Sequence, residues 1–137
     1  MRPHPYLRAY MAGIVVPSIF MLLAPIIFLW GGGFPPPGST TFSVVSLTQL
    51  AIFPGAFVPN LWGLWNMLHL RIRDRVRIPH AAFGALIPLI LVPMVRLRLP
   101  TLIGTEDMLF VLPFGMAAYY LVWKFVVGFL NHEMGIA

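Results

Sequence analysis

Two asparagines in a long apolar stretch are the polar residues best placed to bind something. They flank the segment "NLWGLWN", where Asn60 and Asn66 enclose Gly63, and Gln49 lies upstream in the same stretch. A side-chain amide in hydrocarbon needs a hydrogen-bonding partner, either on another helix or on a bound molecule. Gln49, Asn60, Gly63 and Asn66 are therefore predicted to form a polar contact within a helix bundle, or a site for a ligand, cofactor or ion.

Three histidines provide the second candidate chemistry. His69, His80 and His132 each lie at the edge of an apolar stretch, where a pair could ligate a haem or a chlorin-type pigment. The aromatic run "YYLVWKF" (119–125) could hold a quinone, a pigment or a lipid tail, although aromatic belts at membrane interfaces have the same composition. The sequence requires no cofactor, and it leaves haem, pigment and quinone open.

Metal binding and catalysis are not expected. The chain has no cysteine and no pair of histidines at metal-binding spacing, so we predict no metal site. It also lacks a nucleophile elbow, a phosphate loop and paired carboxylates at one depth, so we do not expect an enzyme. The acidic residues all lie outside the apolar stretches, which disfavours a proton-driven carrier; they are Asp74, Glu106, Asp107 and Glu133.

The elements that position these residues are predicted to be transmembrane helices. Of the 137 residues, 59% are hydrophobic and only 9% are charged, whereas soluble domains are roughly a quarter charged. Four apolar segments approach the roughly 20 residues that span a bilayer. The fold class is thus an all-α integral membrane protein, a single domain over 1–137, with helices at about 9–30, 43–70, 79–99 and 108–130. Prolines in every span predict kinks.

Charge asymmetry predicts the orientation of an up-down bundle. Four crossings place both termini and the middle connection on one side, which carries Arg2, Arg8, Arg71, Arg73, Arg75, Arg77 and Lys124. The other side carries only Arg96 and Arg98. The positive-inside rule then makes both termini cytoplasmic. Eight of the nine basic residues are Arg, and this bias, together with frequent Gly and Pro, favours a bacterial cytoplasmic (inner) membrane.

The middle connection "RIRDRVRI" is the strongest basic run. If it is extended, its arginines share one face, and Arg71, Arg73, Arg75 and Arg77 could contact anionic lipids or an acidic partner. The same run would equally serve as a plain topogenic signal. Nucleic acid is not an expected partner, because the net charge of +5 is concentrated next to the predicted membrane.

A helical wheel of the second span predicts which side chains face inward. Asn60, Gly63 and Asn66 fall in one half of the wheel, and Trp62 and Trp65 fall in the other. On this basis Asn60→Leu is expected to disturb assembly more than Trp62→Leu.

These observations favour a non-catalytic membrane protein that serves as an accessory or assembly subunit of a larger membrane complex. Its expected partners are the lipid bilayer, anionic lipids, and other membrane subunits or further copies of the chain. Two alternatives stay open. One is an oligomeric carrier or channel with its site at the proline-broken middle of the second helix, and the other is a subunit that binds haem, pigment or quinone.

Overall fold

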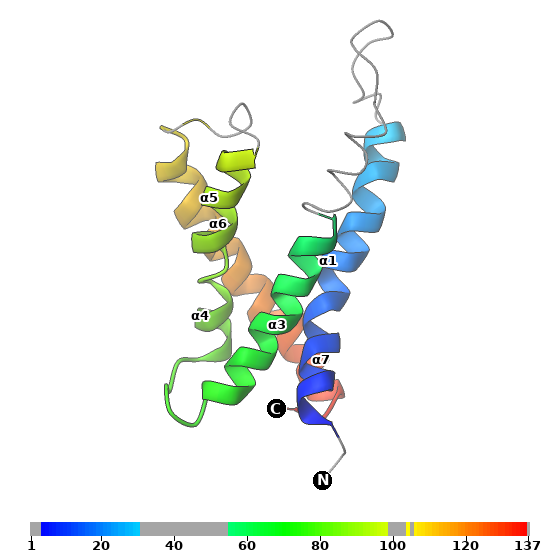
Figure 1. Cartoon of the computed structure of the whole chain (residues 1–137), viewed down its shortest axis with the longest axis vertical. Coiled ribbons are helices and arrows are strands. Elements are labelled where there is room, and N and C mark those ends of the chain that lie inside the picture. The colour runs from blue at the N-terminus through cyan, green and yellow to red at the C-terminus, as the bar shows by residue number, and fades with distance from the viewer. Residues whose placement is uncertain (1–3, 31–54, 99–103, 105, 137) are drawn as a thin grey trace, which may run out of the picture.

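The computed structural model describes residues 4–30, 55–98, 104 and 106–136, and within these ranges helices are joined by turns and no strand is present. This confirms the all-α prediction. The helices are α1 (Pro5–Trp30), α3 (Phe57–Ile72), α4 (His80–Gly84), α5 (Pro88–Arg98), α6 (Met108–Val122), the π-helical segment η2 (Trp123–Val127) and α7 (Gly128–Glu133) (Figure 1).

Three helical segments are long and apolar enough to cross a membrane. They are Pro5–Leu23, His80–Leu97 and Met108–Glu133, and each overlaps a segment predicted from hydropathy. Of the second predicted helix, the structure describes α3, while 43–54 lies outside the described residues.

The third predicted helix is not continuous, which corrects the expectation of one helix over 79–99. It ends at Gly84 and resumes at Pro88, with three turn residues between. Pro88 has no N–H to donate, and its ring crowds the carbonyl four residues earlier, at Gly84. Ile87 instead donates its N–H to that carbonyl across 3.1 Å, in the tighter pattern of a turn.

The last helical stretch is longer than predicted and contains a π-helical segment. It runs without a break from Met108 through η2 to Glu133. At η2 the N–H of Gly128 bonds to the carbonyl of Trp123, five residues back. Such a one-turn widening rotates the following helix relative to the preceding one and changes which side chains face inward.

Helices α1 and α3 run antiparallel along much of their length (Figure 1). They approach closely at two glycines. A Cβ on Gly13 would lie 2.8 Å from the Gly63 Cα and 2.6 Å from the Trp62 carbonyl oxygen. A Cβ on Gly63 would lie 2.5 Å from the Tyr10 ring. Only the absence of side chains at these two positions allows the backbones to approach so closely.

Gly13→Ala is expected to lower the free energy of unfolding in detergent micelles by about 1–3 kcal/mol, because the new methyl group would overlap the backbone of α3. Gly115→Ala is the matched control, since its Cβ would lie 3.6 Å from Pro88, an ordinary contact. Equal stability of the two variants would contradict the close approach of α1 and α3.

The core lies where α3, the α4–α5 turn and η2 meet. Trp62, Ile87, Trp123 and Val127 are buried there. The Trp62 ring packs at 5.9 Å from Trp123 and at 5.0 Å from Tyr119. The start of α1, the α3–α4 connection and the end of α7 all lie at the same end of the molecule (Figure 1).

Candidate functional site

A pair of buried asparagines forms the polar centre of the molecule. Asn66 on α3 is 1% exposed and Asn131 on α7 is 6% exposed. Their amides bond reciprocally: Asn66 Nδ2 donates to Asn131 Oδ1 across 2.8 Å, and Asn131 Nδ2 donates to Asn66 Oδ1 across 3.1 Å. Asn66 Nδ2 also donates to the Ala9 carbonyl of α1 at 2.7 Å. One side chain thus joins three helices.

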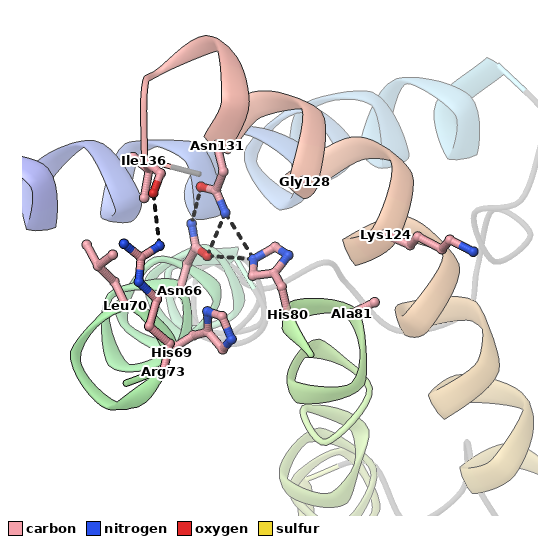
Figure 2. A pocket seen from close by; sticks show the side chains of 10 residues that line it. All are labelled: Asn66, His69, Leu70, Arg73, His80, Ala81, Lys124, Gly128, Asn131 and Ile136. Carbon is pink, nitrogen blue, oxygen red and sulfur yellow. Dashed lines mark hydrogen bonds between the residues drawn. The ribbon is translucent and has the colours of Figure 1, made fainter. Parts of the chain in front are cut away.

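His80, the first residue of α4, adds a fourth element to this centre. Its Nε2 lies 3.0 Å from Asn66 Oδ1 and 3.0 Å from Asn131 Nδ2 (Figure 2). With the proton on Nε2 the ring donates to Asn66, and with the proton on Nδ1 it accepts from Asn131. Either neutral tautomer therefore has a partner in the amide pair.

Aromatic and imidazole rings surround this centre on the α3–α4 side. His69 Nε2 is 3.2 Å from the Ile78 carbonyl oxygen, which can only accept, so this nitrogen donates. The His69 and His80 rings meet edge to face, with centroids 4.9 Å apart. Trp65 stacks on Phe83 at 4.8 Å and donates its indole N–H to the Phe83 carbonyl across 2.8 Å. These contacts fasten α4 to α3.

The structure brings together only two of the three histidines considered as cofactor ligands. His69 and His80 are neighbours, but the Nε2 atom of each already contacts a protein polar group. His132 is exposed on α7. Within the described residues, no three His, Asp or Glu side chains are grouped so as to hold a metal ion.

Asn60 lies outside this centre, which corrects the predicted inward stripe. It is exposed, donates to the Ala56 carbonyl across 2.7 Å and accepts a hydrogen bond from the Tyr10 hydroxyl. Trp62, predicted to face away, is buried. At about 100° per residue, Asn66 lies about 120° from Asn60 but only about 40° from Trp62. Assigning each residue to one of two halves of the helical wheel did not distinguish these two angles. Gln49 lies outside the described residues.

The basic connection is not extended, so its arginines do not share the predicted face. Helix α3 continues to Ile72, and a turn follows in which Arg75 N bonds to the Ile72 carbonyl at 2.8 Å. Arg73 Nη1 donates to the Ile136 carbonyl at 3.0 Å, and Arg8 Nη1 donates to the Met134 carbonyl at 3.1 Å. These two arginines thereby bind carbonyls just beyond the end of α7.

Two pockets adjoin the core. The first, of about 330 Å³, lies beside the amide pair (Figure 2). The second, of about 460 Å³, lies between α1, α3, α5 and α6, and Trp62, Pro88 and Tyr119 are among its mostly apolar lining residues.

Sequence reasoning missed Asn131, the partner of Asn66. It lies just beyond the predicted end of the fourth helix, in "FLNHE", where a polar residue is expected at a membrane boundary. Nothing in the spacing of that segment distinguishes it from an ordinary helix end.

Removing either amide is expected to destabilise the bundle. Asn66→Ala and Asn131→Ala should each lower the free energy of unfolding by about 1–3 kcal/mol, because each leaves buried polar groups without partners. The double variant should cost less than the sum of the single ones. Strict additivity in this double-mutant cycle would show that the amide pair contributes no coupling.

No family model, no curated protein and no solved structure matches this chain.

Proposed function

We propose that the chain crosses a bacterial inner membrane four times, with both termini cytoplasmic, and serves as a non-catalytic accessory or assembly subunit of a larger membrane complex. Support for this topology comes from the three apolar helices and from the basic residues at one end of the molecule. The fourth crossing would use the stretch that ends in α3.

The observation that carries the partner-binding role is an exposed seam on α6. Among its fifteen residues none is buried. The seam consists of residues at a four-three-four spacing, the pattern by which a helix presents one side to a neighbouring helix. They are Phe110, Phe114, Ala117 and Leu121. Phe110 and Phe114 are each 78% exposed and Leu121 is 53% exposed. Two large rings beside a small residue form a ridge and a hollow that a partner helix could fill.

The polar interior supports a structural rather than a chemical role. Asn66 directs both N–H groups of its amide to protein carbonyls, and Asn131 directs its amide to Asn66 and His80. Bonds of this kind between helices hold a membrane bundle together, each contributing on the order of 1 kcal/mol.

Site-specific photo-crosslinking in the native membrane tests the partner role. A photoreactive residue at Phe114 should crosslink to a distinct larger membrane protein, which mass spectrometry then identifies. The control position is Leu22 on α1, which is 70% exposed but lies outside the seam. Crosslinks from Phe114 only to a second copy would favour the oligomeric carrier or channel. Equal crosslinking from both positions, or lipid adducts alone, would contradict the subunit role.

A further inference from the structure

The pocket beside the amide pair has the chemistry of an anion site. It is lined from α3 by Asn66, His69, Leu70 and Arg73, from α4 by His80 and Ala81, from η2 and α7 by Lys124, Gly128 and Asn131, and by Ile136 near the C-terminus. Two of these residues are basic, four carry imidazole or amide groups, and none is Asp or Glu (Figure 2). A pocket whose lining includes basic but no acidic side chains favours a negatively charged ligand.

The two cations have N–H groups to offer. Arg73 uses Nη1 for the Ile136 carbonyl, and the remaining N–H groups of its fork are available to a ligand. The stem of Lys124 lines the pocket, while its ammonium is directed away from the amide pair and lies 5.3 Å from the Phe125 ring (Figure 2). The flexible four-carbon stem lets this ammonium turn toward a ligand at modest cost.

Two carbonyls just beyond α7 are already bonded to arginines. The carbonyl of Met134 accepts from Arg8, and that of Ile136, a residue that lines the pocket, accepts from Arg73. These two carbonyl oxygens therefore repel an anion less than free ones would.

The pocket also has an apolar side. Leu70, Ala81 and Ile136 line it, and Phe125, next to Lys124, is 63% exposed. Several of the pocket's lining residues come from the end of α3, the start of α4 and α7, which lie at the end of the molecule that carries the basic α3–α4 connection (Figure 1). In the proposed topology this end corresponds to the cytoplasmic headgroup layer. A ligand with a phosphate group and an attached hydrocarbon chain matches both sides of this pocket.

We infer that this pocket binds the phosphate group of an anionic phospholipid, with Arg73 and Lys124 as the charged contacts. The inference rests on the proposed membrane topology but not on the accessory role. The remaining arginines of the connection do not line the pocket and act only through the general attraction of the surface.

Native mass spectrometry of protein released from nanodiscs tests this inference. The wild-type chain should retain phosphatidylglycerol from mixed phosphatidylglycerol–phosphatidylcholine nanodiscs and retain no phosphatidylcholine from pure ones. Lys124→Gln should weaken phosphatidylglycerol binding about tenfold, the effect of losing one hydrogen bond between charged groups. Lys124→Arg should restore it. The charge-matched control is Arg75→Gln, which removes an exposed arginine outside the pocket and should weaken binding far less, through the general surface attraction alone.

Further measurements distinguish a lipid phosphate from a soluble phosphate. They also distinguish a failure of this inference from a failure of the proposed topology. Inorganic phosphate should not displace the lipid, and displacement would assign the site to a soluble phosphate instead. Equal losses of phosphatidylglycerol binding in Lys124→Gln and Arg75→Gln would show that general surface charge accounts for the binding, and would overturn the inference. Because Lys124 is exposed, Lys124→Gln should melt at the wild-type temperature. Failure of the chain to enter nanodiscs would overturn the membrane topology, whereas normal entry without lipid preference would overturn this inference alone.

Discussion

Replacing Trp62 with alanine is expected to lower the free energy of unfolding in detergent micelles by about 3–5 kcal/mol, the cost of truncating a large aromatic side chain in a packed core. Trp62 is 5% exposed and contacts the rings of both Tyr119 and Trp123. It also forms part of the wall of the 460 Å³ pocket, so truncation would enlarge an existing void rather than let the surroundings close. Because the surroundings can relax so little, we expect the full cost of truncating a buried tryptophan.

Asn60→Ala is the matched control from the same helix. Asn60 is exposed, and its two hydrogen bonds are to the Tyr10 hydroxyl and the Ala56 carbonyl. We expect a cost of about 1 kcal/mol or less, the net contribution of a typical hydrogen bond. This ranking is the opposite of the one predicted from the half-wheel. A larger loss for Asn60→Ala than for Trp62→Ala would restore the inward polar stripe and contradict the observed rotation of α3.

Gly84→Ala is expected to destabilise the molecule more than Gly13→Ala. A Cβ on Gly84 would lie 2.0 Å from Cγ and 2.6 Å from Cβ of Trp123. Those atoms are the root of the tryptophan side chain, so a change of rotamer at the ring tip cannot relieve the overlap. Trp123 is fully buried, and the backbone of α4 or η2 would have to shift. The expected cost is about 3 kcal/mol, the upper end for overpacking.

The control for this clash is again Gly115→Ala, which adds the same methyl group in ordinary contact with Pro88. Thermal unfolding in detergent, followed by near-ultraviolet circular dichroism of the tryptophans, would report both stability and the environment of Trp123. If Gly84→Ala unfolds at the same temperature as the wild type and has the same near-ultraviolet spectrum, the packing of α4 on η2 is contradicted.

The sequence predicted the helical class because hydropathy acts over long windows and averages out local errors. The first, third and fourth apolar segments all coincide with helical segments of membrane-crossing length, although the third is interrupted by the turn between α4 and α5. The break at Pro88 was not predicted, although two prolines in that segment were visible. A proline inside an apolar helix can either kink it or interrupt it, and the outcome depends on what packs against the freed carbonyl. The π-helical segment likewise leaves no mark in composition.

The candidate site was predicted only in part because it is a tertiary feature. Asn66 was identified from its unusual position in an apolar stretch, but its partners come from Ala9, His80 and Asn131, which are far apart in the chain. A helical wheel drawn for one helix does not show which neighbouring helix supplies the hydrogen-bonding partner. The Arg73 contact with Ile136 was missed for the same reason, since the chain end that accepts it follows more than sixty residues later.

Single-cysteine accessibility tests the proposed membrane topology most directly. Because the natural chain contains no cysteine, each introduced thiol is the only one that a membrane-impermeant maleimide can label. We predict that thiols at His4, Arg75 and Gly135 react only from the cytoplasmic face of sealed vesicles, and that thiols at Ser39 and Glu106 react only from the opposite face. Labelling of Ser39 and Arg75 from the same face, or quantitative labelling of all five positions from one side, would contradict four crossings with cytoplasmic ends.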